Sequence, residues 1–266
     1  MQKIIKPLYR LIIFIILTVI TQIGGIVYLF SLLINKIWKS KLRFKPILSF
    51  IVIYIFAVFL IVPFIAPIFG REKIKHSEKI KPTNYLTVLL NRNYVRPELN
   101  IMFANAEMQL KETDIGIRFL DANFPFINKF PLLPHLSHND GKKVDISLIY
   151  ENEKGEITNR QKSISGYGVF ESPNFREYNQ IEKCLNSGYF QYDYPKYMTL
   201  GTINKDLKFS QKGTKTLIDI LLKNRDLGKL FIEPHLANRL NLNDSRIRYH
   251  GCRAVRHDDH IHIQLN

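Results

Sequence analysis

The clearest strand signal in this sequence is KVDISLIY, residues 143–150. Apolar and polar side chains alternate along it, so Val144 and Ile146 face one way and Asp145 faces the other. Gly141 allows the chain to turn sharply just before this segment. Residues 143–150 therefore predict a strand that carries a carboxylate on the face opposite its apolar residues.

Weaker patterns on either side of this strand predict the rest of a folded domain. They favour strands at 116–121, 229–232 and 260–265, and helices at 98–110, from the Ser210 cap to about Leu222, and at 235–240. Residues 161–197 are rich in Gly, Ser, Tyr and Pro and predict a long loop with short elements. Because strands and helices do not alternate regularly, the sequence predicts an α+β domain with an antiparallel β-sheet rather than a doubly wound sheet.

Two long apolar segments precede this domain. Residues 11–34 and 47–69 contain no charged side chain, and each has at least the roughly 20 residues that a helix needs to cross a bilayer. Pro63 and Pro67 are compatible with a helix in lipid whose neighbours satisfy the freed backbone groups. The first segment is too long for the apolar part of a signal peptide, and no small-x-small cleavage site follows it. We therefore expect a two-helix transmembrane hairpin at 1–70, a linker at 71–84 and a soluble domain at 85–266.

The net charge of +15 is concentrated at the N-terminal end. Up to Lys81 the chain has 13 basic and two acidic residues, and the basic residues flank the apolar segments. Basic residues in that position act as topology signals and contact anionic lipids, so the charge does not indicate nucleic acid as a partner. The link between the two segments has five basic residues and no acidic one, which predicts that it is cytoplasmic. We then expect a protein of the inner (cytoplasmic) membrane whose C-terminal domain is periplasmic or otherwise extracytoplasmic.

The chain contains two cysteines, Cys184 and Cys252. An exported domain can join such a pair in a disulfide, and two unrelated buried thiols fit the sequence equally well. The sequence leaves both alternatives open.

Five of the eight histidines fall into two short clusters that also contain carboxylates. The clusters are PHLSHNDGKKVD, residues 134–145, and RHDDHIH, residues 256–262. Their histidines are His135, His138, His257, His260 and His262. Since residues two apart on a strand point to the same face, His260 and His262 can both enter one site.

Three of these side chains have the chemistry of a catalytic zinc site. If the strands at 143–150 and 260–265 are neighbours, His138, Asp145 and His262 can converge. Two imidazoles and one carboxylate leave the fourth position of a tetrahedral zinc ion open for water. His260 would stand beside the metal, where it can take a proton from that water or stabilise charge on the substrate oxygen. The prediction is one Zn²⁺ per chain.

Each piece of this pattern also has an ordinary structural explanation. A His-x-His pair is common on surface strands, and Asp140-Gly141 fits a capped loop. Asp258 and Asp259 fit a solvated turn as well as they fit a functional role. What packing alone does not explain is that most of the histidines cluster beside carboxylates on predicted strands.

Both clusters resemble motifs of one enzyme family. Residues 137–146, SHNDGKKVDI, resemble the Ser-His-x-x-Gly-x-x-Val-Asp-Ile block of the penicillin-insensitive murein endopeptidases, which belong to the lysostaphin-like, D-Ala-D-Ala-cleaving zinc peptidases. Residues 257–262, HDDHIH, are similar to the family's His-Asp-Asp-His-aromatic-His block, and LFIEP at 230–234 resembles the strand-and-proline segment before it. The resemblance covers roughly residues 115–266 and is weak between the two histidine blocks.

The resemblance implies an antiparallel β-sheet zinc peptidase domain in which His138, Asp145 and His262 bind zinc. It also implies that His260 is the catalytic histidine next to the metal. His135 and His257 would lie near the site as supporting or substrate-binding residues. The implied reaction is metal-assisted hydrolysis of peptide bonds in peptidoglycan cross-links, with peptidoglycan peptides as the partner.

The sequence departs from the family pattern at Ile261, where the family has an aromatic residue, at Arg256, where it has glycine, and in the two-span anchor. The metal residues are intact, so these departures concern the substrate more than zinc. Three other functions remain: a carboxypeptidase that trims a terminal D-residue, a non-catalytic membrane-bound scaffold that binds peptidoglycan, and a metal-sensing or storage module. A tyrosine-rich stretch fits either a substrate groove or a loop packed by its own aromatics; its members are Tyr189, Tyr192, Tyr194 and Tyr197.

Overall fold

A computed structural model describes residues 2–37 and 45–266, with side chains described from Lys6 onward. These residues form two compact units. The first contains the helices up to Lys73 together with Leu86–Pro97 and Ala122–Gly141. The second contains Ile74–Tyr85, Glu98–Asp121 and Lys142–Asn266. Because each unit is assembled from separate pieces of chain, this division differs from the predicted one, which separates the chain once, at residues 71–84.

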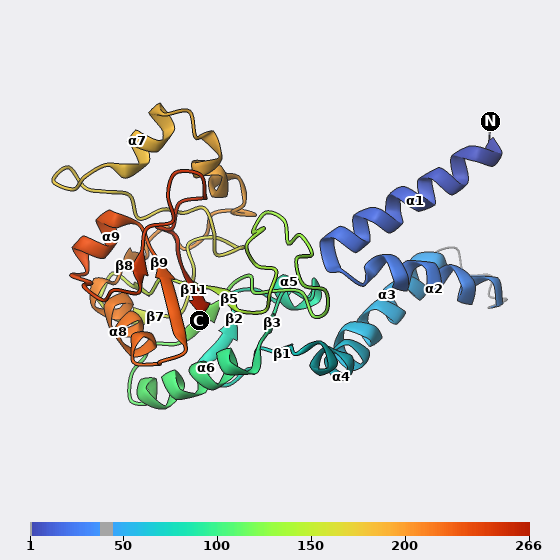
Figure 1. Ribbon diagram of the computed structural model, residues 1–266, viewed down its shortest axis with the longest axis horizontal. Coiled ribbons are helices and arrows are strands. Elements are labelled where there is room, and N and C mark those ends of the chain that lie inside the picture. Colours follow the sequence, from blue (N-terminus) through green and yellow to red (C-terminus); the bar gives the residue numbers. More distant parts are fainter. Residues whose placement is uncertain (1, 38–44) are drawn as a thin grey trace. The chain divides into compact units, whose positions relative to one another are not determined.

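The first predicted span is divided into two helices. α1 (Gln2–Thr21) and α2 (Gly24–Ile37) are separate in Figure 1, and the chain turns between them at Gln22, whose φ is 66°. The Thr21 side chain accepts a hydrogen bond of 2.8 Å from the Gly24 amide at this turn. A Cβ atom on Gly25 would come within 2.7 Å of a backbone oxygen of α1, so only glycine allows the two helices to approach so closely.

The second predicted span is one long apolar helical segment. It is formed by α3 (Lys45–Phe56), the π-helical turn η1 (Ala57–Ile61), α4 (Val62–Ile65) and the 3₁₀ turn η2 (Ala66–Phe69). Among the described residues, Lys45–Phe69 is the one helix that is long and apolar enough to cross a membrane, whereas the apolar α2 has only 14 residues. The structure therefore offers one candidate span and not a clear two-helix hairpin.

The basic link used for the orientation prediction lies largely outside the described residues. Lys39, Lys41 and Arg43 fall within residues 38–44, which the structure does not describe. The cytoplasmic position of this link stays a prediction.

Buried Arg71 braces the part of the first unit that comes from residues 122–141. Its guanidinium donates hydrogen bonds to the Phe124 carbonyl oxygen, to the Asn128 side chain and, at 3.3 Å, to the Asn139 carbonyl oxygen. Three bonds from one buried cation fix the loop that carries the first histidine cluster. The remaining elements of this unit are the antiparallel pair β1 (Glu72–Lys73) and β3 (Tyr94–Val95) and most of α5 (Tyr85–Leu89).

The second unit is built on a six-stranded sheet in the order β10-β9-β11-β5-β4-β2, of which β9, β11, β5 and β2 are labelled in Figure 1. The strands are β2 (Ile80–Pro82), β4 (Ile117–Phe119), β5 (Lys143–Ser147), β9 (Leu227–Phe231), β10 (Ile247–Arg248) and β11 (His260–Leu265). The three central pairs are antiparallel, and the two edge pairs, β2–β4 and β9–β10, are parallel. The predicted α+β class is confirmed, with a mixed sheet in place of a purely antiparallel one.

Helices and a small second sheet complete this unit. The helices are α6 (Pro97–Leu110), α7 (Gln180–Asn186), η3 (Phe190–Tyr197), α8 (Gln211–Leu222) and α9 (Pro234–Arg239). The second sheet is antiparallel and contains β6 (Tyr150–Glu151), β7 (Ile157–Thr158) and β8 (Lys208–Phe209). Ser210 caps α8 as predicted, since its side chain accepts a hydrogen bond from the Gly213 amide.

The predicted strand at residues 143–150 ends earlier, at Ser147. Two residues further on, the backbone amide of Ile149 donates to the Thr214 hydroxyl at 3.1 Å, and its carbonyl oxygen accepts from the Ser210 amide at 2.9 Å. The backbone N–H and C=O groups of Ile149 are therefore hydrogen-bonded to helix α8 and its cap, and cannot pair with a neighbouring strand. The apolar residues of β5 and β11 are fully buried at the centre of the sheet: Val144, Ile146, Ile261 and Ile263.

The segment predicted as a linker contributes a strand. β2 pairs in parallel with β4, in the register Ile80 with Ile117 and Pro82 with Phe119. Ile80 is 3% exposed, so the linker prediction is wrong for this part of the segment. The three-residue strand is too short for its alternation to stand out in the sequence.

Cys184 and Cys252 form a disulfide. It joins α7, which lies in the region predicted as a long loop, to the segment just before the second histidine cluster. Ile181, Cys184 and Tyr192 form a small apolar core of their own around it. The disulfide therefore gives order to a region that has little regular secondary structure.

Candidate metal centre

The candidate centre lies on one face of the strand pair β5–β11. The antiparallel register places Asp145 opposite His262, and Ser147 opposite His260. Because residues two apart on a strand share a face, Asp145, His260 and His262 point to the same side. All three residues are buried, and none is more than 3% exposed. The adjacency of the two strands, on which the sequence argument depends, is present in the structure.

Asp145 is the central group of this face. Its Oδ1 lies 2.8 Å from His262 Nδ1 and 3.7 Å from His260 Nε2. Its Oδ2 accepts a hydrogen bond of 2.8 Å from the Tyr167 hydroxyl. The carboxylate is fully buried, so these contacts take the place of water around its charge.

His260 is held from the side away from Asp145. Its Nδ1 lies 2.5 Å from Asp259 Oδ1, and Asp259 Oδ2 accepts a hydrogen bond from the Gly168 amide. Gly168 has a φ of +81°, and a Cβ atom there would meet the Pro195 carbonyl oxygen at 2.2 Å, so this position requires glycine. The Asp259 contact orients the ring so that Nε2 faces Asp145.

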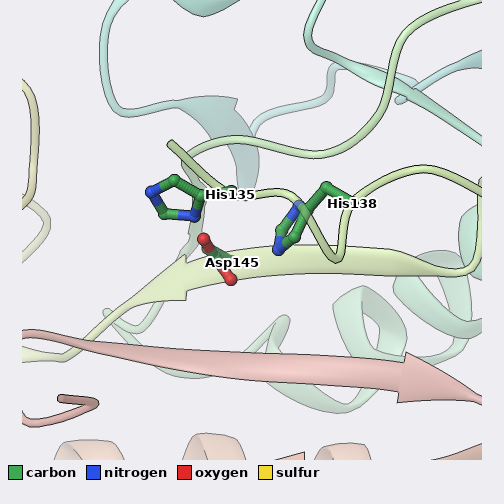
Figure 2. Close-up of side chains that lie close together, drawn as sticks. All are labelled: His135, His138 and Asp145. Atoms are coloured by element: carbon green, nitrogen blue, oxygen red, sulfur yellow. The ribbon is translucent and has the colours of Figure 1, made fainter. Parts of the chain in front are cut away.

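A second pair of imidazoles lies beside the Asp145 carboxylate, at the start of the continuous segment 135–145. His135, His138 and Asp145 each offer one ligand atom, and these atoms all lie within 4.8 Å of one another. Figure 2 shows the two rings on either side of the carboxylate. His138 Nδ1 lies 2.8 Å from the Ala122 carbonyl oxygen, so Nδ1 carries the proton and Nε2 is the ligand nitrogen. This His-His-Asp group can bind a metal ion.

The structure thus distributes the predicted ligands around one carboxylate. His138 and Asp145, both predicted as ligands, belong to the His-His-Asp group, and His135, predicted as a supporting residue, is its third member. His262, the third predicted ligand, contacts the same carboxylate from β11. The predicted catalytic residue His260 lies beside it.

The surroundings of His257 and His260 shift the pKa values of these two residues in opposite directions. Burial by itself lowers the pKa of His260, but the carboxylates of Asp259 and Asp145 outweigh it and raise that pKa to about 9. Burial, together with the neighbouring rings of His260 and His262, holds the pKa of His257 well below its ordinary value. Two adjacent imidazoles with opposite tendencies allow one to carry a proton while the other stays neutral.

The pair Asp258-Asp259 is buried, not solvated. Both residues are at most 1% exposed, and Asp258 receives a two-pronged hydrogen bond from the Arg256 guanidinium. The Arg256 guanidinium also donates a hydrogen bond to Asp193 at 3.0 Å, and its central carbon, Cζ, lies 3.8 Å from the centroid of the Phe170 ring. The interpretation of this pair as a solvated turn is therefore wrong. Arg256, which stands where the family pattern has glycine, neutralises the buried carboxylate of Asp258.

Sequence reasoning missed two groups that support the site. Tyr167, between Gly166 and Gly168, holds Asp145, and Glu233 accepts hydrogen bonds from the His257 amide at 3.0 Å and from the Tyr192 hydroxyl at 2.6 Å. In the sequence, the only local signal for the role of Tyr167 is its position between two glycines. Within the tyrosine-rich stretch, Tyr192 is fully buried, whereas Tyr197 is 73% exposed.

No protein-family model matches the sequence. No curated protein is similar to it at a significant level.

Proposed function

We propose that this chain is a membrane-anchored zinc metallopeptidase that hydrolyses peptide bonds in peptidoglycan cross-links. The observation that carries the proposal is the buried carboxylate of Asp145, which has imidazoles from both histidine clusters beside it. The substrate class comes from the resemblance of those two clusters to the murein endopeptidase motifs.

The donor atoms fit zinc. Imidazole nitrogen and carboxylate oxygen are zinc ligands at about 2.0–2.2 Å. His135, His138 and Asp145 each offer one such atom within 4.8 Å of the others, and His262 Nδ1 lies 2.8 Å from Asp145 Oδ1. Hard cations such as Mg²⁺ and Ca²⁺ prefer sites made of oxygen atoms, and this site is rich in nitrogen. When bound, zinc polarises a scissile carbonyl group and acidifies a water molecule.

The chain's own residues supply the remaining functions. On the resemblance to the murein endopeptidase motifs, we assign His138, Asp145 and His262 as ligands, with His135 and His257 as supporting or substrate-binding residues. The group whose ligand atoms lie within 4.8 Å contains His135 in place of His262. His260 is the acid/base group, because Asp259 holds its Nδ1 side and leaves Nε2 directed at the Asp145 carboxylate. The burial of all these groups, except the partly exposed His135, excludes competing water from the reacting bond.

The N-terminal part is the membrane anchor in this proposal. Lys45–Phe69 crosses the membrane, and we infer that α1 and α2 also lie in it as the other arm of the predicted hairpin. The second unit then acts outside the cytoplasmic membrane, where peptidoglycan lies. A disulfide between Cys184 and Cys252 agrees with an oxidising, extracytoplasmic compartment.

The test uses the full chain in detergent, because β2 belongs to the catalytic sheet and a fragment that starts at Thr83 would lack it. We expect one zinc per chain by elemental analysis, and conversion of purified dimeric muropeptides to monomers. A chelator and the His262→Ala substitution should each abolish the conversion. Release of free D-alanine from a pentapeptide, without cleavage of dimers, would instead establish the carboxypeptidase. Zinc bound with neither cleavage would leave a scaffold, and a folded chain without zinc would refute the proposal.

A further inference from the structure

We propose that a cavity beside the second histidine cluster binds an N-acetylated sugar of the glycan strand to which the peptide substrate is attached. The cavity lies between helix α7, the loop before this helix and the Arg256 side chain. The inference rests on the proposed function and deepens it, because it names the part of peptidoglycan that this surface holds.

The cavity has the size and the lining of a site for one sugar ring. Its volume is about 330 Å³, at the lower end of the range of about 300–1,000 Å³ that small-molecule sites occupy. The apolar side chains of Pro173, Ile181 and Leu185 line one part of it, and the amide side chains of Asn179 and Asn186 line another. A sugar with an acetamido group offers both an apolar ring face and amide hydrogen bonds, so it matches this combination.

The polar groups of the lining can bond to such a ligand. The Ser172 hydroxyl accepts a hydrogen bond of 3.2 Å from Arg256, and no described residue accepts the hydrogen that this hydroxyl can donate. Asn179 Nδ2 donates one hydrogen to Glu182 Oε2 at 3.2 Å and has a second one. Asn186 is exposed at the end of α7 and carries both a donor and an acceptor. Sugar hydroxyl and acetamido groups pair with neutral groups of this kind.

The charges around the cavity favour a neutral ligand. The Arg256 guanidinium is already paired with Asp258, through two N–H groups, and with Asp193 at 3.0 Å. Lys196 also pairs with Asp193, and Glu182 adds a further carboxylate to the lining. The two cations are therefore matched by carboxylates, and no excess positive charge attracts a carboxylate or phosphate group.

The chain keeps the cavity close to the reacting groups. Arg256 is four residues before His260, and four extended residues span at most about 14 Å. Ser172 follows Glu171, whose amide donates to the Asp258 carbonyl oxygen at 2.8 Å, so the loop side of the cavity is bonded to the same segment. A peptide of about four residues between a sugar and the bond to be cut also spans up to about 14 Å. One muropeptide is therefore long enough to occupy the cavity and reach His260.

The wall formed by α7 is fixed before a ligand arrives. Ile181 and Cys184, the buried residues of this helix, pack with Tyr192 in the small apolar core. The Arg256 amide donates to the Tyr192 carbonyl oxygen at 2.9 Å, which ties the Arg256 side of the cavity to the same core. Walls that are already in place reduce the entropy that is lost when a ligand binds.

The first experiment compares two substrates of the full chain in detergent. One is a cross-linked muropeptide dimer that carries its sugars, and the other is the same peptide with the sugars removed. The unaltered chain should have the lower KM for the dimer with sugars. Asn186→Ala removes a hydrogen bond to the sugar and should raise this KM about tenfold, so that the preference is lost, with kcat unchanged. Asn186→Gln, which keeps the amide, should recover part of the loss.

Lys183→Ala is the matched control, because Lys183 is an exposed residue of the same helix and does not line the cavity. This variant should keep the preference for the dimer with sugars. Equal KM values of the unaltered chain for the two substrates would overturn the inference and leave the proposed hydrolysis intact. So would an equal rise of KM for both substrates in Asn186→Ala.

A binding measurement separates the inference from hydrolysis. Calorimetry with an oligomer of N-acetylglucosamine, which carries no peptide, is carried out on the unaltered chain and on Asn186→Ala. Binding that weakens about tenfold in the variant supports the sugar site even if the unaltered chain cleaves nothing. No binding by the folded, unaltered chain, or equal binding by both proteins, overturns the sugar site even if cleavage is observed.

Discussion

Asp145 has a hydrogen-bonding partner on each carboxylate oxygen, and this decides how it can bind a metal. Tyr167 donates to Oδ2, and the same phenol oxygen accepts from the Asp121 amide at 3.1 Å. Its ring packs edge-on against His260, with the centroids 5.1 Å apart. With Oδ2 occupied by the phenol, Oδ1 is the oxygen that faces the imidazoles, which favours a ligand that uses one oxygen.

Tyr167→Phe should weaken metal binding without unfolding the protein. The ring contact with His260 remains, but the carboxylate loses the group that orients it, so zinc affinity should fall about 10- to 100-fold. Competition with a chromophoric chelator measures the affinity, and circular dichroism checks the fold. The control is Tyr197→Phe, an exposed phenol whose loss should leave the affinity unchanged. Equal affinities for both variants would show that Asp145 does not depend on Tyr167.

Glu233 links the pH of the solution to the stability of the fold. Burial raises its pKa to about 7, although hydrogen bonds from Tyr192 and the His257 amide oppose this, and nearby Asp258 adds to the rise. Between its ordinary value of 4.5 and about 7, the folded chain keeps a proton that the unfolded chain has lost. Stability should therefore fall as the pH rises through this window, by about 3 kcal/mol, and should fall no further from this group above it.

Glu233→Gln should remove this dependence, because the amide is neutral at every pH and can still bond to Tyr192 and the His257 amide. Urea unfolding of the metal-free protein at pH 4.5, 6 and 7.5 gives the free energy of unfolding of both proteins. The free energy of unfolding of the variant, minus that of the unaltered chain, should increase as the pH rises. Parallel profiles would mean that folding does not raise the pKa of Glu233.

At the scale of elements, the sheet depends on a strand that precedes the segment predicted as the soluble domain. Ile80 of β2 is buried, and the Thr83 amide just after this strand donates to the Phe119 carbonyl oxygen of β4 at 2.8 Å. The strand closes the edge of the sheet next to β4, which is itself bonded to β5. Loss of β2 would expose β4 and disturb the strand that carries Asp145.

Ile80→Ala in the full chain should lower the free energy of unfolding by about 2–5 kcal/mol, because it leaves a cavity beneath the sheet edge. Lys81→Ala, an exposed residue on the same strand, should change it by no more than about 0.5 kcal/mol. Urea unfolding followed by circular dichroism compares the two variants. Equal, small effects are what a flexible linker would give, and they would contradict the pairing of β2 with β4.

At the scale of the whole molecule, the feature that bears on localisation is the one long apolar helix among the described residues, Lys45–Phe69. Many apolar side chains on Lys45–Phe69 are exposed, among them Ile55 at 45% and Phe64 at 83%. A helix with so many exposed apolar side chains is stable in lipid and unfavourable in water.

Ile55→Arg near the middle of this helix should impair membrane insertion, because arginine at the centre of a spanning helix costs about 3 kcal/mol. Ile55→Leu is the matched control and should insert normally. Carbonate extraction of membranes from expressing cells measures the fraction retained. If the arginine variant stays fully in the membrane fraction, the segment is not the main anchor.

The sequence by itself determines the features that depend on neighbouring residues. Alternation along residues 143–147 and 260–265 marks β5 and β11, and Ser210 marks the start of α8, because periodicity and capping are local properties. The two histidine clusters, and with them a metal as the expected chemistry, are also visible without the fold. So is an apolar segment long enough to span a membrane.

Only the tertiary structure decides the features that depend on residues far apart in the chain. Tyr167 meets Asp145, and Glu233 meets the His257 amide, across loops whose sequence has no repeating pattern. The close approach of α1 and α2 turns the chain at Gln22 inside what reads as one uninterrupted apolar segment. Arg256 keeps Asp258 in the interior, which no local pattern of charges predicts. The physical reason is the same in each case: hydrogen bonds, burial and helix contacts between distant segments outweigh local preference, and a single sequence does not reveal which distant residues will meet.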